Sequence, residues 1–172
     1  MGIIGCGRIA DLHHAAYAHN PEAKLCAVCD AEPAVVEARG DEWGIRKRYV
    51  DYRALLNDRE IDAVEIVTPQ TLHEPMVIEA ARADRHIAVQ KPMTVDIASA
   101  DRMLAAVREA GVTYKVTDNY VFYPPIRLAK QLIDDGVIGE PQMLRMKFVG
   151  GRWHDGWAVP EDTWGWRRAE IE

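Results

Sequence analysis

The sequence has few cysteines, no excess of positive charge and no long hydrophobic run. Three cysteines among 172 residues cannot form the framework of a small disulfide-rich protein. With 21 basic and 27 acidic residues the net charge is −6, whereas binders of nucleic acid or membrane surfaces need a basic face. No apolar run approaches the ~20 residues of a membrane span. We therefore expect neither a nucleic-acid partner nor a membrane.

Targeting and metal-binding signals are also missing. No basic segment precedes an apolar stretch at the start, so we expect no signal peptide and a reduced, cytoplasmic protein. Cys26 and Cys29 form a C-x-x-C, a spacing found in redox and metal sites. They lie in an apolar run typical of a buried strand, where residues three apart point to opposite faces. We interpret both as small core residues and expect no metal site.

What the sequence does have is a regular alternation of short apolar runs and helical patterns. The runs that predict strands cover residues 2–4, 24–29, 47–50, 63–67, 86–90 and 113–116. The helical patterns cover about 8–19, a segment starting at 33, 71–83 and 95–110. Such an alternation predicts an α/β fold, in which βαβ units build a parallel sheet with helices on both faces.

Several residues mark the expected helix ends. Pro33 suits a first helical position, where its missing N–H costs nothing. Thr71 and Glu74 have the spacing of a capping box. The last helix stops at Gly111, and its predicted apolar stripe consists of Ile97, Ala100, Leu104 and Val107.

The regular alternation of predicted strands and helices ends after about residue 118. Pro124 and Pro125 open a helix that should end near Gly136, and residues 142–149 alternate like a strand. Four tryptophans follow, whose rings either stack on sugars or pack in a core or subunit interface: Trp153, Trp157, Trp164 and Trp166. We expect one domain over 1–120 and the incomplete start of a second α/β domain over 121–172.

A G-x-G-x-x-A motif directly follows the first strand and opens the first helix. Gly5 permits a tight turn, Gly7 lets the backbone approach a pyrophosphate, and the small Ala10 lets helix and strand pack closely. The N–H groups of Arg8 and Ile9 belong to the helix N-terminus, which favours phosphate. The motif predicts a Rossmann-type dinucleotide site formed by these five residues.

Asp30 closes the second strand, 20 residues after Ala10. An acid at this place accepts hydrogen bonds from the adenosine ribose hydroxyls and repels a 2′-phosphate. Residues 31–33 offer no Arg or Lys to bind such a phosphate, so the sequence favours NAD over NADP. The alternative is a turn Asp that caps the next helix.

Loops after the other strands should line the same crevice. Thr68 and Pro69 follow the strand at 63–67, and His73 either contacts the cofactor region or is simply a polar residue of its helix. Gln90 ends the strand at 86–90, and Lys91 follows it. Lys91 is either a group that exchanges a proton with a substrate hydroxyl or an ordinary surface lysine.

These motifs in this order resemble the Gfo/Idh/MocA oxidoreductase family, over essentially the whole chain. The resemblance implies a substrate and proton-handling role for Lys91, and Gln90 stands where the family has Glu. It also implies that Asn119, which starts a segment similar to the family's second domain, lies among the cofactor-binding residues. Val121 stands where the family often has Arg.

The resemblance implies an NAD-dependent enzyme that transfers hydride at a secondary alcohol of a sugar or cyclitol, working as a homo-oligomer. The family's Asp-x-x-x-His element is absent from 150–172, and His154 beside Asp155 does not replace it. We therefore expect this chain to bind NAD without turnover. Two alternatives are a stand-alone NAD-binding or regulatory protein and a dehydrogenase for a non-sugar substrate such as a dihydrodiol or biliverdin.

Overall fold

The computed structural model describes residues 1–147, and the chain divides into two units, Met1–Arg127 and Leu128–Glu172. The first unit contains a six-stranded sheet in the order β3-β2-β1-β4-β5-β6, with every pairing parallel. The strands are β1 (Gly2–Ile4), β2 (Ala27–Cys29), β3 (Lys47–Tyr49), β4 (Ala63–Ile66), β5 (His86–Gln90) and β6 (Tyr114–Thr117). The predicted Rossmann-type α/β fold is confirmed.

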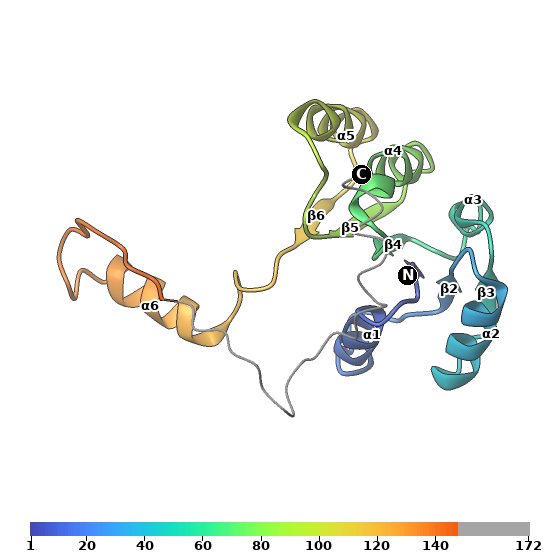
Figure 1. Ribbon diagram of the computed structural model, residues 1–172, viewed down its shortest axis with the longest axis horizontal. Coiled ribbons are helices and arrows are strands. Elements are labelled where there is room, and N and C mark those ends of the chain that lie inside the picture. Colours follow the sequence, from blue (N-terminus) through green and yellow to red (C-terminus); the bar gives the residue numbers. More distant parts are fainter. Residues whose placement is uncertain (148–172) are drawn as a thin grey trace. The chain divides into compact units, whose positions relative to one another are not determined.

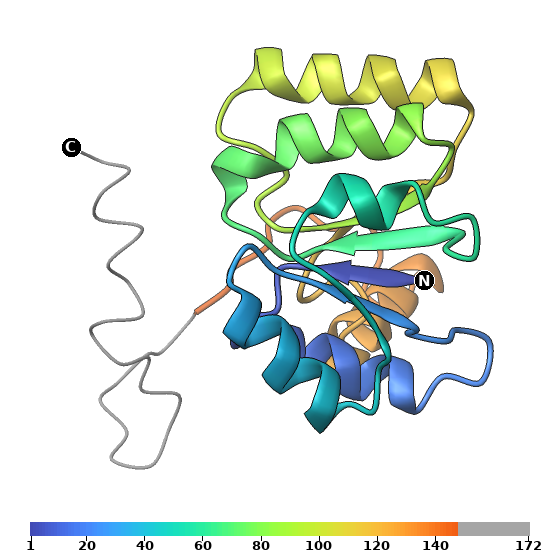
Figure 2. The ribbon, with the colours of Figure 1, turned by 90° about the vertical axis from the view of Figure 1, so that its right-hand side faces the viewer.

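Helices cover both faces of this sheet (Figures 1 and 2). One face carries α1 (Ala10–Ala18) and α2 (Pro33–Glu42), and the other carries α3 (Tyr52–Leu56), α4 (His73–Arg82) and α5 (Ile97–Ala110). Successive strand residues point to opposite faces. Ile3 and Val28 thus join the core under α1 and α2, whereas Ile4 and Cys29 join the larger core under the other helices.

Element boundaries differ from the sequence patterns by up to three residues. β2 begins at Ala27 instead of 24, β4 ends at Ile66, and α1 begins at Ala10 instead of 8. The helix start predicted by the capping box at Thr71 and Glu74 does not coincide with the start of α4 at His73. A 3₁₀ turn, η1 (Gln70–Leu72), precedes α4 and makes Leu72 its N-cap. The carboxylate of Glu74 instead pairs with Arg102 of α5.

The predicted apolar stripe of α5 is also displaced. The buried residues of this helix are Ser99, Met103 and Val107, so Val107 of the predicted stripe is buried as expected, whereas Ile97 is 80 % exposed. Packing against α4 decides which face is buried, and Met103 lies in the core shared by the two helices. Both ends conform to capping rules, because Asp96 accepts the N–H of Ser99 and Gly111 adopts a left-handed φ of 67°.

Between β6 and residue 147 the structure contains one more helix, α6 (Pro124–Asp134), which begins at the predicted proline pair. The strand predicted over 142–149 is wrong for 142–147, which form no strand. A strand needs a hydrogen-bonded neighbour, and the described residues supply none there. The rest of that segment and the four late tryptophans lie outside the described residues. Within residues 1–147 no helix is long and apolar enough to cross a bilayer.

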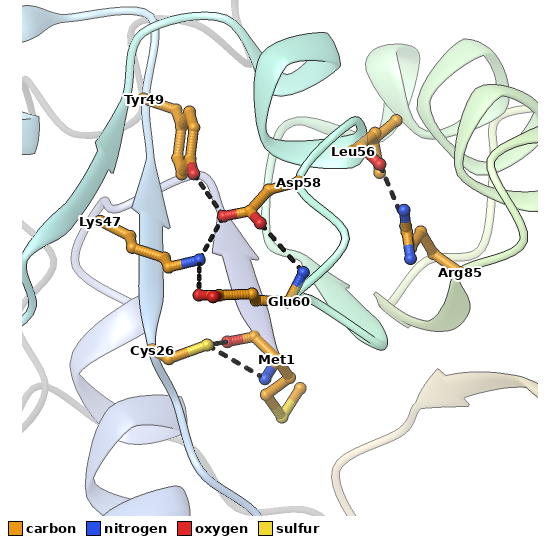
Figure 3. A network of polar contacts seen from close by, with 8 residues as sticks. All are labelled: Met1, Cys26, Lys47, Tyr49, Leu56, Asp58, Glu60 and Arg85. Carbon is orange, nitrogen blue, oxygen red and sulfur yellow. Dashed lines mark hydrogen bonds and ion pairs between the residues drawn. The ribbon is translucent and has the colours of Figure 1, made fainter.

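A polar network secures the edge strand β3, away from the site described below (Figure 3). Lys47 pairs with Asp58 and Glu60, and the Tyr49 hydroxyl donates to Asp58 Oδ2 over 2.7 Å. The Lys47 ammonium, the Glu60 N–H and the Tyr49 hydroxyl hold the pKa of Asp58 far below its usual range. These contacts tie β3 to the loop before β4.

Cys26 lies beside this network and Cys29 lies inside β2, and both thiols are free. Cys29 is buried, as predicted, whereas Cys26 is partly exposed and its thiol contacts Met1 O at 3.3 Å. The expectation of opposite faces is wrong. The strand starts only at Ala27, so its alternation does not extend to Cys26, and both residues pack against the same core.

Candidate functional site

The loops that follow the six parallel strands all leave the sheet at its carboxyl edge. The residues that the sequence predicts for the site all end a strand or follow one in the chain, after β1, β2, β4, β5 or β6: Gly5, Gly7, Arg8, Ile9, Ala10, Asp30, Thr68, Pro69, His73, Gln90, Lys91 and Asn119. The strand order reverses at β1, which lies between β2 and β4. In open α/β sheets ligands bind outside the carboxyl ends at such a switch point.

The glycine turn after β1 has the geometry of a phosphate-binding turn. Gly5 has a φ of +93°, and a Cβ there would lie 2.7 Å from the Val67 carbonyl oxygen, so only glycine fits. A Cβ on Gly7 would meet no described atom within 4 Å. The backbone at Gly7 is therefore open to a ligand, while Ala10 is fully buried where α1 meets the sheet.

The N-terminus of α1 follows this turn. The Ala10 N–H bonds back to Gly7 O, and Ile9 is the N-cap of the helix. The N–H groups of Arg8 and Ile9 therefore precede the first helical turn and have no carbonyl of an earlier turn to bind. With the positive end of the helix dipole behind them, they suit a pyrophosphate.

Asp30 is held next to the same turn. Its Oδ2 accepts the Cys6 N–H at 2.8 Å, and its Oδ1 accepts the Glu32 N–H at 3.0 Å. The second bond is a turn interaction, but it is not the helix cap that the sequence offers as the alternative to ribose binding, because Glu32 is the N-cap of α2. It leaves each carboxylate oxygen with a further lone pair, so the turn role does not exclude a ribose contact.

Arg39 of α2 contacts the backbone of the glycine turn, a role that the sequence reasoning missed. Its Nε donates to the Cys6 carbonyl at 3.2 Å, while its guanidinium pairs with Asp11 and Glu42. Nothing in its local sequence indicates this role, because the contact depends on how α2 packs beside α1. With two carboxylates around it, Arg39 is not a free cation beside Asp30.

His73 lies behind the site and is almost fully buried, with 1 % of its surface exposed. Its Nε2 lies 2.9 Å from Thr68 O, and its Nδ1 lies 3.0 Å from Pro92 O and 3.1 Å from Met93 O. His73 thus ties the loop after β4 to the loop after β5. The contacts of the His73 ring with these carbonyl groups hold the two loops together.

Lys91 follows the last residue of β5 and is exposed. Its backbone N–H donates to Gln90 Oε1 at 2.8 Å, and the Lys91–Pro92 peptide bond is cis. The amide nitrogen of Gln90 lies 2.9 Å from His13 Nε2. The side-chain amide of Gln90 therefore contacts His13 of α1 through its nitrogen and the backbone of Lys91 through its oxygen.

The sequence reasoning also missed His13, Tyr17 and Glu65. Glu65 is the third residue of β4 and only 1 % exposed, and it contacts both other side chains on α1. A signal for Glu65 exists, since it is a charged residue inside the apolar run at 63–67. His13 lies one turn after Ala10 on the helix that opens at the glycine motif.

Asn119 follows β6 at the far end of the same edge and is exposed. Its N–H donates to Asp118 Oδ1 at 2.7 Å. The preceding Thr117 hydroxyl donates to Val89 O at 3.0 Å, which anchors the end of β6 to β5. Asn119 is thus placed at the predicted edge, and its contact with a cofactor stays a prediction.

Comparison with known proteins identifies the family. A model described as "Oxidoreductase family, NAD-binding Rossmann fold" matches residues 1–118. The chain belongs to the Gfo/Idh/MocA oxidoreductase family. The open backbone at Gly7 and the fixed carboxylate of Asp30 fit the NAD that this fold binds.

Two curated relatives are similar over most of this chain. An uncharacterized oxidoreductase, YrbE, from Bacillus subtilis is 37 % identical over 84 % of the chain and 42 % of its own length. An inositol 2-dehydrogenase from Rhizobium meliloti is 36 % identical over 84 % of the chain and 43 % of its own length.

A solved oxidoreductase from Agrobacterium radiobacter, in complex with NAD+, L-tartaric acid and magnesium, superposes with a TM-score of 0.79 at 32 % identity. The match covers 81 % of this chain and 41 % of that one. The chain thus spans about two fifths of the length of each of these three relatives.

Proposed function

We propose that this chain is the N-terminal part of an NAD-dependent oxidoreductase of the sugar or cyclitol dehydrogenase type. The observation that carries the proposal is the pairing of an open glycine backbone at Gly7 with the fixed carboxylate of Asp30, at the switch point of the sheet. Relatives named for inositol oxidation support the substrate class.

In this proposal each residue has a separate task. The N–H groups from Gly7 to Ile9 bind the pyrophosphate, and Asp30 accepts hydrogen bonds from the adenosine ribose. Bound NAD supplies the hydride acceptor. Lys91 holds or takes up the proton of the substrate hydroxyl, and the exposed position of its side chain leaves it accessible to a substrate.

The remaining parts of the proposal concern the whole protein. We propose a boundary near residue 120, with the residues from 121 onward beginning a substrate and oligomerisation domain. The family relationship favours a homo-oligomer, and the free thiols are compatible with a reducing cytoplasm. Because the family's Asp-x-x-x-His element is absent from this sequence, the 172-residue chain should bind NAD without oxidising a polyol.

Substitutions at Gly7 test the cofactor site. Gly7→Ala should fold normally, because the added Cβ meets no described atom, but it should obstruct the approach of a pyrophosphate. We expect the dissociation constant for NADH, measured by calorimetry, to rise at least tenfold, or about 1.4 kcal/mol, and to rise further in Gly7→Val. The unfolding midpoint should stay unchanged in Gly7→Ala. An unaltered affinity in both variants would reject the site.

A further inference from the structure

A line of polar side chains runs from the interior of the sheet to Lys91. The Tyr17 hydroxyl donates to Glu65 Oε2, and Glu65 Oε1 lies 2.7 Å from His13 Nδ1. His13 Nε2 lies 2.9 Å from Gln90 Nε2, and Gln90 Oε1 accepts the Lys91 N–H at 2.8 Å. Four side chains from α1, β4 and β5 thus connect a buried carboxylate with the backbone of Lys91.

The direction of each bond follows from the end at Lys91. A backbone N–H can only donate, so the oxygen of the Gln90 amide must face Lys91 and its NH₂ must face His13. Because that NH₂ also donates, His13 Nε2 must be the acceptor. A neutral imidazole carries its hydrogen on the other nitrogen, and in His13 this is Nδ1, which faces Glu65.

Glu65 is the buried carboxylate at the interior end of this line of side chains. No donor among residues 1–147 makes a hydrogen bond of good geometry to Oε1. The Nδ1–H of His13, whose nitrogen lies 2.7 Å from Oε1, is the group that compensates the buried negative charge there. Burial, and then the hydrogen bond to Glu65 and its negative charge, raise the pKa of Tyr17. Tyr17 therefore remains a donor, and a buried carboxylate without these donors would be costly.

We propose that Glu65 and His13 are positioning residues that orient the Gln90 amide, and through it the backbone of Lys91, and that they require an amide at position 90. The importance of Lys91 itself rests on the proposed function. A carboxylate at position 90 would place an acceptor against the acceptor Nε2 of His13. The contact would be relieved only if the imidazole took up a second proton between two carboxylates.

The tautomer of His13 is the first test. Nitrogen-15 NMR of the side chain in the complete 172-residue chain distinguishes a protonated from an unprotonated ring nitrogen. We expect a protonated Nδ1 and an unprotonated Nε2 in His13. The signal is assigned by its loss in His13→Ala. A His13 with its hydrogen on Nε2, or with both nitrogens protonated at neutral pH, would overturn the proposal.

The effect on Lys91 is tested with two neighbouring histidines. His13→Ala removes the partner of the Gln90 amide, so the Lys91 N–H resonance should shift and lose protection from hydrogen exchange. His14→Ala is the matched control, because His14 stacks on Trp43 with ring centroids 4.6 Å apart and lies outside the line. Equal responses of Lys91 to both variants would refute a positioning role for His13.

A charge exchange tests the requirement for an amide. Gln90→Glu should lower the unfolding midpoint while Glu65 is present. In Glu65→Gln the two contacts of His13 can reverse, since the amide introduced at position 65 then donates to Nδ1 and Nε2–H donates to the carboxylate introduced at position 90, while Tyr17 and the Lys91 N–H remain donors. Gln90→Glu should therefore cost less in that background, and the His13 hydrogen should move to Nε2. Equal costs in both backgrounds would disprove the coupling.

These experiments need neither cofactor nor substrate. If the chain fails to bind NADH while His13 shows the expected tautomer, the proposed function fails and the positioning line stands. If the chain binds NADH but His13 shows the other tautomer, the line fails and the proposed function stands.

Discussion

The backbone N–H of Cys6 donates to Asp30 Oδ2 over 2.8 Å, which joins the glycine turn after β1 to the end of β2. This bond orients the Asp30 carboxylate before any cofactor is present. A charge-assisted hydrogen bond of this kind contributes about 1.5–3 kcal/mol. Asp30 therefore both stabilises the turn and provides the acid beside it, and substitutions must separate the two roles.

Asp30→Asn removes the charge but leaves an oxygen that can still accept the Cys6 N–H. The wild-type chain should bind NADH at least tenfold more tightly than NADPH, or about 1.4 kcal/mol, because the carboxylate repels a 2′-phosphate. In Asp30→Asn this preference should narrow while the unfolding midpoint stays close to that of the wild type. Tryptophan fluorescence titrations with both nucleotides measure it. Glu32→Ala is the control, and an Asp30→Asn chain with full discrimination would contradict the assignment.

Lys91→Ala should affect turnover without affecting cofactor affinity. We expect kcat to fall about 10²-fold or more, because a positioned proton-transfer group contributes that much. The measurement needs a chimera that joins residues 1–120 to the C-terminal part of the Rhizobium meliloti inositol 2-dehydrogenase, assayed with inositol. Lys24→Ala is the control, because Lys24 precedes β2 and so lies at the amino ends of the strands, opposite the predicted site. Near-normal turnover in Lys91→Ala would make Lys91 an ordinary surface lysine.

Cys6 and Cys29 should resist alkylation in the folded chain. Burial first, and then the Asp30 carboxylate, raise the pKa of Cys6 to about 12, and burial likewise raises the pKa of Cys29 to about 12. Since only the thiolate reacts, iodoacetamide at pH 8 should modify these two cysteines only on unfolding. Cys26 is partly exposed and should react first. Mass spectrometry locates the label, and rapid labelling of folded Cys6 would show that the burial is wrong.

Asp58 should make the fold sensitive to acid. Its pKa is well below its usual range in the folded state, mainly because of Lys47. A carboxyl with a depressed folded pKa stabilises the fold above its unfolded pKa of about 3.9, and the stabilisation is lost as the pH falls through the folded pKa. Asp58→Asn should therefore lower the unfolding midpoint at pH 7.

The matched control for Asp58 is Glu60→Gln, because Glu60 also pairs with Lys47 but is 78 % exposed. Its effect at pH 7 should be smaller than that of Asp58→Asn, as exposed ion pairs contribute little. The difference between wild type and Asp58→Asn should shrink as the pH falls below about 4. A difference that stays constant between pH 7 and pH 3 would exclude the ion pair as its cause.

The sequence by itself determined the α/β fold and placed the predicted site at the carboxyl edge of the sheet. A recognisable residue directly follows three of the strands, Gly5 after β1, Asp30 after β2 and Lys91 after β5. Parallel strands place all carboxyl ends at one edge. Local pattern was enough here because glycine turns and strand ends depend on backbone conformation within a few residues.

Only the tertiary structure decided which distant side chains meet behind that edge. The contacts of Arg39 with Cys6, of His73 with Pro92, and of His13 with Gln90 all join separate βα units. Packing also decided which face of α5 is buried. Hydrogen bonds between βα units depend on how the helices pack against the sheet. The hydrophobic periodicity of a single segment does not determine that packing.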